Sequence, residues 1–218
     1  MSYFKHIDNG EGPVKLFIGG VHGSEGETSI KLINRLKKED FADGQIYIYN
    51  FDKSPYISTV NEEYYTSEMG LKIIDLIKKY NPDFYTELHC YNIKNFEKLT
   101  NRSRLKTQNV PPLIDCGEYI LVSSVSPLIR TKYFTKETIC KTLEIPCLHN
   151  EEKLKFAEDN YQFDAEKSIN RYMDVLKLIT ISTSREDFTE RISKDYPKQV
   201  DLAREYVKYV FGEFFPPF

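Results

Sequence analysis

The segment that sets the expected fold is Val14-Lys15-Leu16-Phe17-Ile18-Gly19-Gly20-Val21-His22-Gly23-Ser24-Glu25-Gly26. Its mostly apolar start predicts a β-strand at 14–18, and the glycine-rich residues that follow predict a loop. A 3.6-residue period of apolar side chains over 28–38 then predicts a helix. A strand, a loop and a helix in this order are typical of an α/β unit.

The rest of the chain continues this alternation of strands and helices. Further strands are predicted at 45–50, 83–90, 119–124 and 139–146, and helices at 68–80, 165–181 and 198–211. The last two strands flank a turn at Ser126-Pro127. We therefore predict an α/β fold with a mixed, mainly parallel sheet flanked by helices. It forms one domain over 1–218, with an irregular excursion at about 91–118 and a helical C-terminal third.

Composition excludes several classes of protein. The 218 residues are 40% hydrophobic and 14% aromatic, which is too rich in core-forming side chains for a disordered chain. The net charge of -3 provides no overall cationic field, so neither nucleic acid nor an anionic membrane is an expected partner. No apolar run reaches the roughly 18 residues of a membrane helix, and the polar N-terminus does not have the pattern of a signal peptide.

The four cysteines contain no Cys-x-x-Cys pair, so we expect no disulfide framework and a reducing cytoplasmic location. The aromatic tail at 211–218 either packs on the domain or docks another subunit, which leaves a homo-oligomer open.

Two of the four histidines fall at the ends of predicted strands. His22 and Glu25 form a His-x-x-Glu pair after the first strand, and His89 closes the strand at 83–90. Ligands of α/β sheets bind outside the carboxyl ends of the strands. Two imidazoles and one carboxylate there would provide the three protein ligands of a single catalytic zinc ion. The alternative for His22 and Glu25 is a pair that only stabilises the loop.

Glu144 is a carboxylate within the otherwise apolar strand at 139–146. Burying it is costly unless it is paired, hydrated or functional. A glutamate beside a zinc-bound water is the general base that hydrolysis of a carbonyl compound requires. The alternative is an edge-strand glutamate that faces solvent.

Three ordered segments resemble the zinc carboxypeptidase superfamily, and especially its succinylglutamate desuccinylase and aspartoacylase branch. They are Gly19-Gly20-Val21-His22-Gly23-Ser24-Glu25, Glu87-Leu88-His89 and Thr142-Leu143-Glu144-Ile145-Pro146, within about 14–146. The resemblance implies one zinc ion held by His22, Glu25 and His89, with Glu144 as base and then proton shuttle. It implies a zinc-dependent hydrolase of an amide bond, at a peptide C-terminus or in an N-acyl amino acid.

The chain departs from that family in its substrate-binding residues. Asn50 resembles a strand-end asparagine of the family, but the family's Asp-Leu-Asn-Arg segment corresponds here to Thr59-Val60-Asn61-Glu62, which has no arginine. The candidates to replace that arginine as a fork for a substrate carboxylate are Arg102, Arg104 and Arg130, each alternatively an ordinary surface residue. The missing arginine also favours a second reading, a catalytically degenerate member that acts as a binding or scaffold protein.

Two residues that lie close in sequence to these candidates, His149 after Glu144 and Cys90 after His89, have open roles. His149 is either a contact of the site or a surface histidine, and Cys90 is expected to face the core, opposite His89 on its strand. A structural metal is a third reading, although structural zinc usually has four protein ligands that include cysteine.

Overall fold

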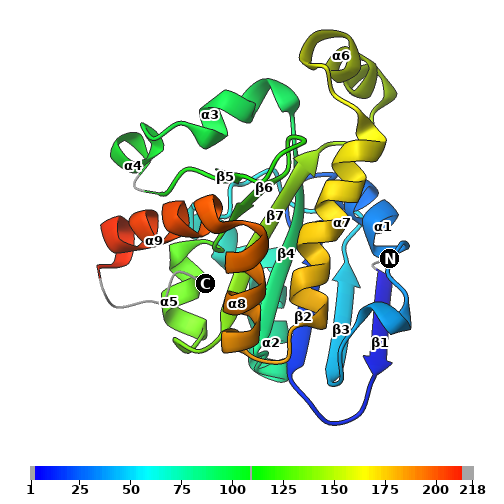
Figure 1. Cartoon of the computed structure of the whole chain (residues 1–218), viewed down its shortest axis with the longest axis vertical. Helices are drawn as coiled ribbons and strands as arrows, with labels where there is room; N and C mark the ends of the chain where they lie inside the picture. Colours follow the sequence, from blue (N-terminus) through cyan, green and yellow to red (C-terminus); the bar gives the residue numbers. More distant parts are fainter. Residues whose placement is uncertain (1–2, 109, 213–218) are drawn as a thin grey trace.

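The computed structural model describes residues 3–108 and 110–212, and it has an α/β architecture with helices on both faces of one sheet (Figure 1). Over these residues the sheet has seven strands in the order β1-β3-β2-β4-β7-β6-β5. Strands β3, β2, β4 and β7 are parallel, while β1, β6 and β5 join them antiparallel toward the edges. The strand bounds are β1 Tyr3–Asp8, β2 Val14–Gly19, β3 Gln45–Asn50, β4 Phe84–Tyr91, β5 Ile114–Asp115, β6 Leu121–Ser123 and β7 Ile139–Pro146. The predicted mixed, mainly parallel sheet is confirmed.

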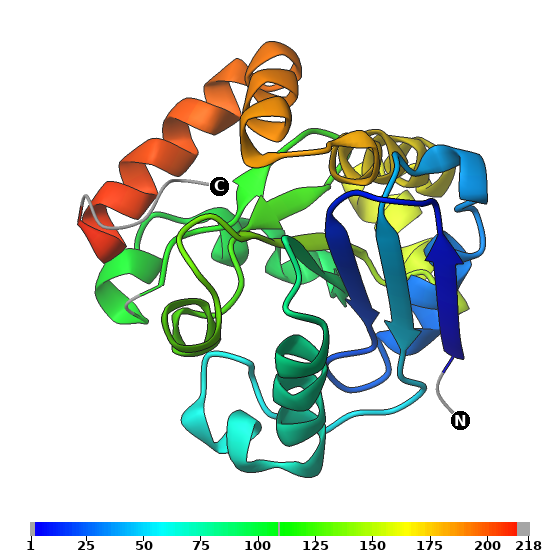
Figure 2. The same ribbon diagram turned by 90° about the horizontal axis from the view of Figure 1, so that it is seen from below.

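Alternating side chains of the central strands form two apolar cores, one on each face of the sheet. One core packs β2 and β4 against α1, α7 and α8, and the other packs the opposite face against α2 and α5. Figure 2 shows this division, with α7 and α2 on opposite sides of the sheet. The helix bounds are α1 Gly26–Ile33, α2 Glu68–Tyr80, α3 Phe96–Thr100, α4 Arg104–Thr107, α5 Pro127–Tyr133, α6 Glu151–Tyr161, α7 Ala165–Ile181, α8 Arg185–Asp195 and α9 Pro197–Phe211. Short 3₁₀ helices lie at η1 Lys38–Asp40, η2 Glu62–Thr66 and η3 Ile93–Asn95.

Where the apolar period is long and regular, the predicted bounds agree with the structure. The ranges 45–50, 139–146, 68–80 and 165–181 are those of β3, β7, α2 and α7. Strand β1 was not predicted, because an edge strand with exposed alternate residues has no apolar run. Helices α6 and α8 were not predicted either, because their sequences are polar and bury few side chains. The predicted turn at Ser126-Pro127 begins α5, because Ser126 caps the helix and Pro127 fits its first turn.

The excursion at 91–118 is partly helical: it contains η3, α3, α4 and the short strand β5. In Figure 1 α3 and α4 extend from the end of the sheet where β4 and β7 finish. Most of the aromatic tail, 213–218, lies outside the described residues. None of the helices in the described part of the chain has both the length and the apolar character needed to cross a membrane.

A buried lysine joins β2 to the end of α7. Lys15 is fully buried, and its ammonium donates hydrogen bonds to the carbonyl oxygens of Ile179 (3.0 Å), Thr180 (2.5 Å) and Ser182 (2.5 Å). The amino group satisfies carbonyl groups that the helix leaves without partners. Burial lowers the pKa of Lys15 to about 7, and the charged form interacts favourably with the negative end of the helix dipole. The contact holds α7 against the strand that leads into the loop of His22.

The expectation of no disulfide is wrong. Cys90 at the end of β4 and Cys147 just after β7 form a disulfide with their Cα atoms 4.9 Å apart, although 57 residues separate them in sequence. They meet because β4 and β7 are parallel neighbours, which the cysteine spacing does not reveal. Cys116 and Cys140 are buried free thiols.

Candidate functional site

The predicted site residues come from three neighbouring parallel strands. His22 and Glu25 lie in the loop after β2, His89 lies near the end of β4, and Glu144 lies near the end of β7. All four line one cleft of about 600 Å³. Its opposite wall comes from the excursion and from the segment after β6, with side chains that include Asn92, Lys98, Leu99, Arg104, Pro111, Ser124 and Ser126. The carboxyl ends of the strands thus meet at a cleft, as an open α/β sheet requires.

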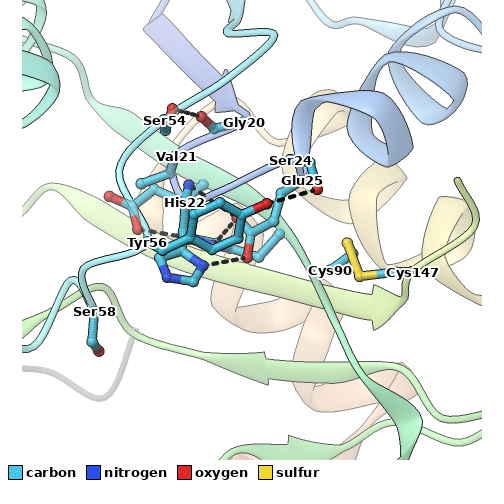
Figure 3. Close-up of polar contacts among 12 residues, drawn as sticks. Gly20, Val21, His22, Ser24, Glu25, Ser54, Tyr56, Ser58, Cys90 and Cys147 are labelled. Atoms are coloured by element: carbon cyan, nitrogen blue, oxygen red, sulfur yellow. Dashed lines mark hydrogen bonds and ion pairs between the residues drawn. A yellow bond between two sulfur atoms is a disulfide. The ribbon is translucent and has the colours of Figure 1, made fainter. Parts of the chain in front are cut away.

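The loop after β2 has a tightly packed backbone that positions His22 and Glu25. Gly20 has φ +71°, and a Cβ atom there would collide with the carbonyl oxygen of Phe51. The carbonyl of Gly20 accepts a hydrogen bond from Ser54, and that of Val21 accepts one from the buried Tyr64 hydroxyl at 2.6 Å. Figure 3 shows Ser54 meeting Gly20 beside the labelled His22 and Glu25. Helix α1 begins directly after Glu25, which fixes that residue at the start of the helix.

A chain of buried polar contacts runs from β4 to this loop. The Tyr85 hydroxyl donates to Glu87 at 2.8 Å, and the other Glu87 oxygen lies 3.1 Å from Nε2 of His89. Nδ1 of His89 lies 2.9 Å from Glu25 Oε2. Positions 85, 87 and 89 share one face of the strand because side chains alternate along it. Glu87 therefore orients the imidazole, and Nδ1 is the ring nitrogen that faces Glu25.

The charges of Glu25, Glu87 and His89 stabilise one another. Burial alone would lower the pKa of His89, but the nearby carboxylates of Glu25 and Glu87 raise it well above its ordinary value. Burial alone would raise the pKa of Glu25, but His89 and the hydrogen bonds of His22 and His89 hold it below its ordinary value. The Glu25–His89 contact is thus a buried ion pair supported by a second carboxylate.

His22 is the most exposed of the three predicted metal ligands. Its backbone N–H donates to Glu25 Oε2 at 3.2 Å, its Nδ1 lies 3.7 Å from Oε1, and 34% of its side chain is exposed. Its ring packs nearly perpendicular to that of Tyr56, which lies beside it in Figure 3. No choice of one ligand atom each from His22, Glu25 and His89 places all three within 4.8 Å of one another. Two imidazoles and a carboxylate are the ligand types of a catalytic zinc site. In this structure the three side chains contact each other and do not surround one common point.

Glu144 lies opposite His89 in the register of β4 and β7. Its strand is central, between β4 and β6, so the alternative of a solvent-facing edge strand is wrong. Its side chain is half-buried in the cleft wall, and burial raises its pKa to about 7 even though His89 opposes the rise. A carboxyl group with such a pKa both accepts and returns protons near neutral pH.

The predicted substrate-binding residues do not come together. Arg104 lines the cleft and interacts electrostatically with Glu144, while its guanidinium donates to Leu99 and Gln108. The other three do not line the cleft, and each has a polar partner within the protein. Asn50 joins Ser29 and Gly26, Arg102 pairs with Glu205, and Arg130 donates to carbonyls at 135, 136 and 138.

Glu87 and Tyr85 were not predicted as partners of His89. The available signal was the alternation of Tyr85, Glu87 and His89, which places all three on one face of a strand. His149 is half-buried behind the loop, where its ring nitrogens meet the hydroxyls of Thr28 (3.0 Å) and Ser24 (3.3 Å). Cys90 belongs to the apolar core, as the alternation predicts.

The chain belongs to the family described as "Uncharacterized protein conserved in archaea (DUF2119)", whose model matches residues 10–212. It is 39% identical over 204 residues to "Uncharacterized protein MJ0501" of Methanocaldococcus jannaschii. The matched region covers 91% of this chain and 92% of that protein. Among solved structures, a bacteriophage poly-gamma-glutamate hydrolase covers 88% of this chain and 90% of its own, with 11% identity and a TM-score of 0.34.

Proposed function

We propose that this protein is a zinc-dependent hydrolase that cleaves an amide bond in a small molecule or a peptide. The observation that carries the proposal is the convergence of His22, Glu25, His89 and Glu144 on one cleft from three separate strands. The three ordered motifs resemble those of the zinc carboxypeptidase superfamily, which supports the same chemistry. The substrate is then a peptide C-terminus or an N-acyl amino acid.

The donor set fits a zinc ion in its chemistry. Glu25 and His89 are already in contact, and His89 has its second ring nitrogen held by Glu87, an arrangement common for histidine ligands. His22, with a third of its side chain exposed, has room to change rotamer without disturbing the core. When bound, zinc would act as a Lewis acid toward the carbonyl and promote ionisation of water.

In this proposal Glu144 performs the proton transfers. Its carboxylate removes a proton from the attacking water while the water oxygen forms a bond to the carbonyl carbon. The carbon–nitrogen bond then breaks, and Glu144 returns the proton to the leaving amine. Arg104 faces the same cleft, and its planar guanidinium is suited to hold a carboxylate of the substrate.

Metal content provides the first test. We expect about one zinc per chain in protein purified with its disulfide intact, and loss of that zinc in His89→Ala. The matched control is His6→Ala, an exposed histidine on β1, which keeps the metal. If neither the wild type nor the control binds zinc, the proposal is refuted.

Activity provides the second test. Zinc-loaded protein is screened against N-acyl amino acids and short peptides, with Glu144→Gln as the inactive control. Hydrolysis by the wild type that falls at least 100-fold in Glu144→Gln is the expected result, because general bases contribute about this much or more. Equal activity of the two proteins would exclude Glu144 as the base.

A further inference from the structure

A second group of metal-ligating side chains lies next to the cleft, whose lining residues include Cys90. Ligand atoms of Cys90, Cys147 and His149 all lie within 4.8 Å of one another. Within residues 3–108 and 110–212 this is the only set of three histidine, cysteine, aspartate or glutamate side chains that meets this limit. The two sulfur atoms are joined as a disulfide, which Figure 3 shows beside the loop of Glu25.

The strand pairing brings the three residues together. Cys90 is the residue before the end of β4, and the backbone N–H of Cys147 donates to the carbonyl of Tyr91 at 3.0 Å just past the end of β7. Cys147 packs against the same apolar core as Cys90 and Leu148, and two residues further along His149 is half-buried. The sheet therefore fixes the position of the two cysteines, and His149 follows in the bend just after β7.

The imidazole of His149 is held in place by two hydroxyl groups. Nδ1 lies 3.0 Å from Oγ1 of Thr28, which also accepts the backbone N–H of Leu148 at 2.9 Å. Nε2 lies 3.3 Å from Oγ of Ser24. Whichever nitrogen binds a metal, the other keeps a hydroxyl partner, which is the support that histidine ligands usually have.

We propose that Cys90, Cys147 and His149 form a second metal site, suited to Zn²⁺, that exists only when the Cys90–Cys147 disulfide is reduced. Two thiolates and one imidazole are ligands that zinc prefers, and three protein ligands leave a fourth position for water. Oxidation of the cysteines removes both thiolates, so the disulfide and the metal exclude each other.

The reduction step balances with a dithiol as reductant. The dithiol becomes a disulfide and supplies two electrons and two protons, the Cys90–Cys147 S–S bond breaks, and each cysteine becomes a thiol. Zinc binding then releases both thiol protons, and the two thiolates neutralise the charge of the ion. The proposal does not depend on the proposed function, because none of its ligands belongs to the set of His22, Glu25 and His89.

The test uses the full-length protein before and after anaerobic treatment with dithiothreitol and desalting. Thiols are counted after denaturation. The purified protein should show two, Cys116 and Cys140, and the reduced protein should show four. The reduced protein should bind one more Zn²⁺ per chain than the oxidised protein. With Co²⁺ as the probe, it should gain thiolate-to-cobalt charge-transfer absorption in the near ultraviolet, which imidazole and carboxylate ligands do not produce.

Variants assign the ligands. Cys147→Ser should lose both the additional zinc and the charge-transfer absorption, and His149→Ala should bind zinc at least tenfold more weakly. Cys116→Ser, which changes a buried cysteine outside the group, should behave as the wild type. For protein that holds the disulfide before treatment, equal zinc content before and after reduction would overturn the proposal, and so would charge-transfer absorption that survives in Cys147→Ser.

Discussion

Replacing Glu144 by glutamine should stabilise the protein at alkaline pH while removing its proposed activity. Burial raises the pKa of this carboxyl group from 4.5 to about 7. Each pKa unit corresponds to about 1.4 kcal/mol, so the ionised form costs the folded protein about 3 kcal/mol. Glutamine has nearly the same shape and no charge to bury, so Glu144→Gln removes this cost.

The sign of the pH dependence follows from proton binding. Between pH 4.5 and about 7 the folded protein holds a proton that the unfolded chain releases, so the free energy of unfolding of the wild type falls as pH rises. The free energy of unfolding of Glu144→Gln should therefore exceed that of the wild type by about 1 kcal/mol at pH 5 and about 3 kcal/mol at pH 8.

Urea denaturation followed by circular dichroism, in buffer with a metal chelator, measures both values. The control is Glu39→Gln, an exposed glutamate on η1, for which no comparable gain is expected. A difference between Glu144→Gln and wild type that is the same at pH 5 and pH 8 would refute the reasoning, because a constant offset reports packing rather than ionisation.

Three further predictions concern other contacts. Lys15→Met should lower the free energy of unfolding by about 2 kcal/mol or more in urea titrations, since it leaves three buried carbonyls without their donor. Lys155→Met, which changes an exposed lysine, is the control and should alter that free energy little. Glu87→Gln should weaken zinc binding about 10- to 100-fold in competition with a chelator, because His89 loses the carboxylate that orients it. Gly20→Ala should lower the melting temperature more than Gly10→Ala: both have positive φ, but only at Gly20 would the added methyl collide with backbone.

Local sequence patterns were sufficient for much of the sheet. Strands β3 and β7 and helices α2 and α7 have strong apolar periods, so their ends could be predicted. The positions of His22, Glu25, His89 and Glu144 near strand ends could also be predicted, because the sequence shows where an apolar strand stops and which residues stand at that point. The polar elements β1, α6 and α8 were not, because their few buried side chains form a pattern only against the neighbouring elements.

Contacts between distant residues were decided by the tertiary structure. The pairing of β4 with β7 and its register join Cys90 to Cys147 and place Glu144 opposite His89. The fold of the excursion brings Arg104 to the cleft, while Asn50, Arg102 and Arg130 stay away from it. The sequence by itself determined the alternation of strands and helices and the residue types at the strand ends, because these depend on local periodicity. Which of those side chains meet depends on the register of parallel strands, and that register is set by packing across the whole sheet.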